Sequence, residues 1–157
     1  MGKETRKTIL KTLKGVGNLK YVKVRGVPMR QDTEYGNVID AKVIDRVEKL
    51  VAKGLILKEI PIRGQEVTFF RSVFALSQRD FAQRLGLSHV AVFKWEKAKS
   101  KQLDLVNEVA VKVLISGLLG LDIKARLESL VGHGQIPKNL ILDYSDADAK
   151  SKEELAA

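Results

Sequence analysis

The order of hydrophobic and polar residues after the first 20 positions predicts a short β segment followed by helices. Residues 19–39 carry β-branched and aromatic side chains, which favour strands, around two turn-favouring stretches at Gly26-Val27-Pro28 and Tyr35-Gly36-Asn37. We expect a small two-stranded hairpin in this part of the chain.

Helical spacing begins directly after this hairpin. Apolar residues recur three and four positions apart between residues 41 and 55, with Asp40 as a candidate N-cap and Gly54 as the expected end. The stretch from Ile56 to Gly64 then predicts a connector, because Pro61 interrupts a helix and favours extended geometry in the residue before it. We expect a boundary between two small domains at this connector.

The pattern stays helical from Gln65 almost to residue 131, and its breaks divide it into five helices, a number typical of a compact helical domain. The acidic end, residues 133–157, has little apolar surface to bury, and we expect it to be flexible. The predicted fold is therefore mainly α, with a five-helix domain at residues 61–132 preceded by a small α+β domain, a hairpin plus a helix, at residues 1–60.

The first 20 residues are basic, and their apolar side chains fit one stripe of a helix with lysines opposite. Such a segment could lie on an anionic membrane, cover the small domain, or form an arm along DNA. A structural or DNA-tracking role is favoured over the membrane role. The apolar residues of the stripe are Ile9, Leu10, Leu13 and Val16.

Composition limits the chemistry of the chain. It has 157 residues, no cysteine and two histidines, which excludes a cysteine-rich zinc site, a disulfide framework and a thiol nucleophile. No catalytic pair of side chains or phosphate-binding glycine loop is recognisable, so we expect no enzyme activity, no cofactor and no metal. The formal charge of +9 instead favours a polyanionic partner such as nucleic acid. Because the start is charged and no apolar run is long enough for a membrane span, we expect a cytoplasmic protein without a membrane partner.

Two helix starts and a glycine lie close together in LSQRDFAQRLGLSHVAVFKWE, residues 76–96. Ser77 precedes a short helix as an N-cap, Ser88 repeats the arrangement before a second helix, and Gly86 suits a left-handed residue between them. Short turns of this kind, often with glycine, join the two helices of a helix-turn-helix. We expect the second helix to protrude, held by apolar contacts of Phe81, Leu85, Leu87, Val92 and Trp95.

The outer side of the second helix carries side chains suited to the major groove of DNA. His89 and Lys94 can donate hydrogen bonds to guanine, and Val90 can contact a thymine methyl group. We expect Gln78, at the start of the first short helix, to bond a phosphate and to brace the N-terminus of the next helix. Two alternatives remain: residues 76–96 could form a helical hairpin without a DNA role, and the lysines could simply face solvent. The candidate DNA-binding residues are Gln78, Ser88, His89, Val90, Lys94, Lys97 and Lys99.

The segment FFRSVFALSQRDFAQRLGLSHVAVFKWEKAKS, residues 69–100, resembles the helix-turn-helix domains of the lambdoid phage repressors and Cro, the xenobiotic-response-element type. The resemblance implies a five-helix, lambda-repressor-like domain that binds operator DNA as a homodimer and reads bases through His89, Val90 and Lys94. The family usually has a glycine two residues after the Glu that closes the recognition helix, and this chain has Ala98 there. A left-handed Ala costs about 1 kcal/mol relative to Gly, so we expect the following loop to differ.

The stretch before it, residues 21–71, is similar to the MqsA-type or YgiT-type antitoxin regulators, which are HigA-like and carry a small zinc-binding unit before the same DNA-binding domain. This chain lacks their zinc cysteines, so the metal is not carried over and ordinary packing is expected instead. Two functions remain open: an autoregulatory transcriptional repressor on operator DNA, or the antitoxin of a type II pair whose residues 1 to about 60 neutralise a toxin. The apolar stretch LISGLLGL, residues 114–121, is either core or the seam of the homodimer.

Overall fold

The computed structural model describes residues 7–121 and 135–147, and it contains a four-stranded sheet as well as helices. The strands are β1 (Thr8–Val16), β2 (Leu19–Asp32), β3 (Gly36–Val38) and β4 (Leu140–Asp143). The helices are α1 (Ala41–Leu57), α2 (Gly64–Val73), α3 (Gln78–Arg84), α4 (His89–Lys97) and α5 (Leu105–Leu119), and a 3-10 turn, η2, spans Tyr144–Ala147.

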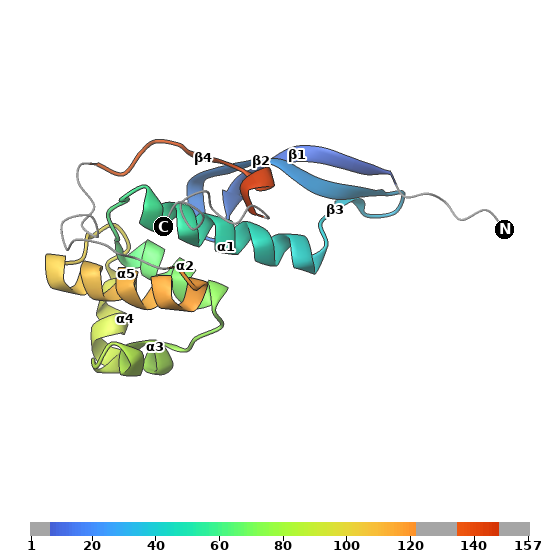
Figure 1. The fold of residues 1–157 in the computed structure, drawn as a ribbon. Helices are drawn as coiled ribbons and strands as arrows, with labels where there is room; N and C mark the ends of the chain where they lie inside the picture. Colours follow the sequence, from blue (N-terminus) through green and yellow to red (C-terminus); the bar gives the residue numbers. More distant parts are fainter. Residues whose placement is uncertain (1–6, 122–134, 148–157) are drawn as a thin grey trace.

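The prediction of a mainly α fold is wrong, because the sheet is larger than a hairpin and is not confined to the start of the chain. β2 runs through 14 residues and pairs with all three other strands, antiparallel to β1 and β3 and parallel to β4. β4 follows α5 in the sequence, so strands from the two ends of the chain meet in one sheet (Figure 1). The fold is therefore α+β, with sheet and helices sharing one hydrophobic core, instead of a five-helix domain that follows a separate small unit.

The basic opening forms β1 and not the helix that its apolar spacing suggested. Pairing with β2 decides this outcome, since Gly15 and Gly17 have φ angles of 86° and 54° and let the chain reverse directly into β2. β2 also continues through the turn predicted at Gly26, which has a φ of 70° beside a shift in register and forms a bulge within the strand. The turn before Gly36 is confirmed, between β2 and β3.

α1 forms a layer between the sheet and the remaining helices (Figure 1). Asp40 is its N-cap residue as predicted, although its side chain makes no capping hydrogen bond. The helix does not end at Gly54, which is buried and faces Leu142 of β4: a Cβ on Gly54 would lie 3.1 Å from that side chain. Part of the end that we expected to be flexible therefore forms an ordered strand, in which Leu140 and Leu142 are buried and Leu142 packs against Gly54 of α1.

The hydrophobic core extends without a break from the sheet to the helix-turn-helix. Val22 of β2, Leu55 of α1 and Val92 of α4 are all fully buried members of one cluster. The connector belongs to this core too, since Ile60 and Ile62 are buried. The fifth helix predicted after α5, at residues 122–132, lies outside the described residues. Across the helices that the structure does describe, none has the length and apolarity needed to cross a membrane.

Candidate nucleic-acid interface

α3 and α4 form the end of the molecule farthest from the sheet (Figure 1), and both predicted N-caps are confirmed. The Oγ atom of Ser77 accepts a hydrogen bond from the backbone N–H of Asp80 at 3.0 Å, and that of Ser88 accepts one from Ala91 at 3.4 Å. Gly86 lies between the helices with a φ of 69°, the left-handed conformation expected of it. The local signals in residues 77–91 thus predicted this corner correctly.

One side of the α3–α4 pair is packed against the body of the protein. Phe81, Ala82 and Val92 are buried, and Leu85, Leu87 and Trp95 are partly buried against the core. Burial of these apolar side chains supplies most of the energy that holds the two short helices, because helices of this length are marginal alone in water.

An ion pair connects the far end of α4 to α2. Arg71 of α2 donates to Glu96 of α4 with an N–O distance of 2.9 Å, and another of its nitrogens donates to the carbonyl oxygen of Leu76 at 2.9 Å. The side chains of Arg71 and Glu96 are 24% and 8% exposed. Charge-assisted hydrogen bonds are stronger in such a shielded position than at the surface, so the pair fixes the orientation of α4.

Gln78 joins this cluster, and the expected role is corrected. Its Nε2 atom donates to Glu96 at 2.6 Å, so it braces the C-terminal end of α4 and not the N-terminal end. One N–H of the amide remains for a phosphate after this bond. Sequence reasoning missed the bracing role of Arg71 and Glu96, because two residues 25 positions apart produce no local pattern.

The opposite side of α4 faces solvent. The candidate DNA-binding residues that were expected on its outer side are all exposed. Phe93, which lies on the same side, is also exposed. Lys99, on the loop after α4, is also exposed. The exposed candidates are Ser88, His89, Val90, Lys94, Lys97 and Lys99.

The loop that leaves α4 is anchored to the start of α2. The backbone N–H groups of Gly64 and Gln65 donate to the carbonyl oxygens of Lys101 and Lys99 at 3.3 and 3.1 Å. Gly64 permits this approach, since a Cβ there would lie 1.8 Å from the carbonyl oxygen of Trp95. Ala98 has a φ of −87°, so the left-handed strain considered for it does not arise. The contact with α2 shapes this loop, and no glycine is needed after α4.

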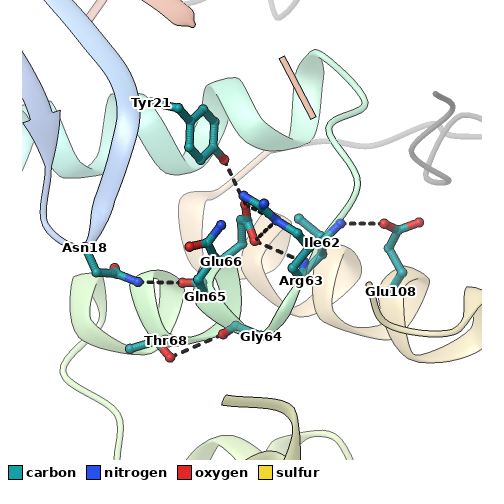
Figure 2. Close-up of polar contacts among 9 residues, drawn as sticks. All are labelled: Asn18, Tyr21, Ile62, Arg63, Gly64, Gln65, Glu66, Thr68 and Glu108. Carbon is teal, nitrogen blue, oxygen red and sulfur yellow. Dashed lines mark hydrogen bonds and ion pairs between the residues drawn. The ribbon is translucent and has the colours of Figure 1, made fainter. Parts of the chain in front are cut away.

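A second polar cluster fastens the start of α2 to the sheet (Figure 2). The hydroxyl of Tyr21 on β2 donates to the buried carboxylate of Glu66 at 2.9 Å, and Arg63 donates to the same carboxylate at 2.6 Å. The Arg63 guanidinium also lies 5.6 Å from the centre of the Tyr21 ring. Burial is the main cause that raises the pKa of Tyr21 above its ordinary value of 10.0, and the negative charge of Glu66 raises it further.

Two further hydrogen bonds in Figure 2 attach the start of α2 and the residues before it. Asn18 donates to the carbonyl oxygen of Gln65 at 2.9 Å, and the backbone N–H of Ile62 donates to Glu108 of α5 at 2.6 Å.

Comparison of the chain with protein-family models gave no match, and searches among curated proteins and solved structures found no significant similarity. Among the side chains that the structure describes, no group of three or more His, Asp or Glu residues is arranged to hold a metal ion. The exposed side of α4 and the lysines on and after this helix are the features from which a function can be inferred.

Proposed function

We propose that the chain is a sequence-specific DNA-binding regulator that represses transcription as a homodimer on operator DNA. The observation that carries this proposal is the α3–α4 corner, in which α4 is fastened along one side through Val92 and Glu96 and exposed along the other. A major groove admits one α-helix, and a helix held in this way can enter it without disturbing its own packing. Such a function implies action in the cytoplasm.

The exposed side chains suggest a division of roles. His89, Val90 and Lys94 contact base edges, while Ser88, Lys97 and Lys99 contact the phosphate backbone. Arg79 and Arg84 of α3 are exposed as well and add positive charge on the same two helices. Gln78 acts mainly by holding Glu96, and its remaining N–H is available to a phosphate. The proposal needs no cofactor and no catalytic group.

The surface of α5 supports the homodimer. Val106 and Val113 are 76% and 53% exposed, and residues seven apart lie on one face of a helix. Water contact with such a face is unfavourable, and a second copy would cover it. The seam considered at residues 114–121 is partly core, because Ile115 is fully buried. We therefore assign the dimer contact to the Val106–Val113 face.

Toxin neutralisation is the second candidate function, and the open edge of the sheet favours it. β1 pairs with β2 alone among the strands described, and its Leu10 is 70% exposed. An exposed strand edge can accept a strand from another protein. A toxin bound there would leave α4 free, so the antitoxin and repressor functions are compatible. Co-purification of the product of the adjacent gene with the wild-type chain, and its loss on Leu10→Lys, tests this alternative.

Nuclease protection of the DNA upstream of the gene tests the main proposal. Two protected half-sites should lie one helical turn apart, about 10–10.5 base pairs, or a multiple of it. Lys94→Ala should abolish the footprint at concentrations where Lys42→Ala, a change of an exposed lysine on α1, retains it. Uniform coating of the probe without discrete sites, or an equal footprint for both variants, would rule out recognition by α4.

A further inference from the structure

We propose that a cavity beside the helix-turn-helix binds a small molecule carrying a phosphate or pyrophosphate group, such as a nucleotide. The cavity has a volume of about 780 Å³ and lies between the β1–β2 turn, the start of α2, the loop after α4 and the segment before β4. Small-molecule sites in proteins usually enclose about 300–1,000 Å³. A ligand of nucleotide size therefore fits.

Positive side chains from three distant parts of the chain converge on this cavity. Lys20 comes from β2, Lys99 from the loop after α4 and Lys138 from the segment before β4. All three are exposed, and none forms an ion pair with another residue in the described ranges. No Asp or Glu belongs to the described lining. Three uncompensated positive charges around a concave site attract a ligand with more than one negative charge.

Two residues that line the cavity are held in place by a buried carboxylate. Tyr21 and Arg63 are both bonded to the buried Glu66, which fixes their orientation (Figure 2). Because Glu66 compensates Arg63, the charge of the ligand must be met by the three lysines. The Tyr21 ring and Ile136 both line the cavity and offer apolar surface to the carbon skeleton of the ligand. This combination suits a phosphorylated organic molecule better than a simple ion.

Lys99 links the cavity to the candidate DNA interface. Its carbonyl oxygen accepts the backbone N–H of Gln65, another lining residue, at 3.1 Å, so the loop after α4 forms one wall of the cavity. A phosphorylated ligand that binds the Lys99 side chain withdraws it from the DNA backbone. The ligand should therefore weaken DNA binding; this consequence depends on the proposed function, whereas ligand binding itself does not.

Calorimetric titration of the full chain without DNA tests the site, with inorganic pyrophosphate and adenosine diphosphate as probes. The wild type and Lys42→Ala should bind them equally. Lys138→Ala, which lies outside the candidate DNA-binding set, should bind them about tenfold more weakly or not at all, since one charge-assisted hydrogen bond is lost. Absence of binding by the wild type, or equal binding by Lys138→Ala, would overturn the proposal.

Titration of the same variants with DNA distinguishes a small ligand from a backbone phosphate. Lys138→Ala should bind DNA like the wild type. Pyrophosphate should weaken DNA binding by the wild type and by Lys42→Ala, but not by Lys138→Ala. If Lys138→Ala weakens DNA binding while the free protein binds neither probe, the cavity holds backbone phosphate and the proposal is wrong. Probe binding by a chain that binds no DNA would support the cavity and reject the proposed regulator function.

Discussion

The contact between Gly64 and the end of α4 gives the sharpest stability prediction. A Cβ added at Gly64 would lie 1.8 Å from the carbonyl oxygen of Trp95 and 3.0 Å from that of Ala98. Close carbon–oxygen contacts in proteins are about 3.3 Å, so Gly64→Ala must separate α2 from α4 by more than about 1 Å. Both oxygens are backbone atoms, so neither can move aside as the end of a flexible side chain could.

The expected cost is about 3–4 kcal/mol. Overpacking a rigid site costs up to about 3 kcal/mol. Separation also breaks the backbone hydrogen bonds from Gly64 to Lys101 and from Gln65 to Lys99, each worth about 1 kcal/mol net. The better helix propensity of Ala offsets about 1 kcal/mol of this cost. The cost of the backbone contact therefore exceeds the stabilisation that comes from helix propensity.

Urea denaturation of the wild type, Gly64→Ala and Gly117→Ala measures this effect. Gly117 is an exposed helical glycine whose added Cβ would meet nothing within 4 Å, so Gly117→Ala should stabilise by up to about 1 kcal/mol. The two glycine replacements should thus have opposite signs. An unfolding free energy for Gly64→Ala equal to or above the wild-type value would refute the close packing of α2 on α4.

Three further changes test the contacts that shape the interface. Arg71→Ala should lower the unfolding free energy by about 2–4 kcal/mol by stranding the shielded Glu96, and in a double-mutant cycle the Arg71→Ala/Glu96→Ala pair should cost less than the sum of the single changes. Because the pKa of Tyr21 is raised, the folded state keeps a proton that the unfolded state releases, and the unfolding free energy should fall as pH rises above about 10. In denaturation curves measured at a series of pH values, Tyr21→Phe should make this fall smaller. Gly86→Ala should cost about 1 kcal/mol in thermal or urea unfolding, because its φ of 69° strains a side chain while the space around it is open. A neutral Gly86→Ala would mean that the corner between α3 and α4 has another conformation.

The sequence predicts α3 and α4 well because their signals are short-range. Ser77, Ser88 and Gly86 each act within three or four residues of their own position, and the structure confirms all three. β1 is different, since a basic segment with spaced apolar residues suits both a helix and a strand, and only its pairing with β2 decides between them. β4 has four residues, and its burial depends on the space left beside Gly54 of α1. Neither pairing can be recognised from local patterns.

In the candidate interface too, local patterns predict some of the residues, whereas others depend on contacts between distant parts of the chain. The outward side of α4 follows from helical periodicity, so its exposed residues could be named from the sequence. The residues that hold α4 could not, because Glu96 depends on Arg71 in another helix and Trp95 depends on the absence of a side chain at Gly64. Gln78 bonds Glu96 near the C-terminal end of α4, whereas its position in the sequence indicated the N-terminal end.

Fluorescence anisotropy with labelled operator and random duplexes, at one fixed salt concentration, tests recognition by α4 most directly. Lys94→Ala should reduce the preference for the operator by about 1–3 kcal/mol, with the loss confined to one base pair of each half-site. Lys99→Ala should weaken both duplexes alike and lower the salt slope by about 1. Unchanged binding of both duplexes by Lys94→Ala would contradict recognition through α4.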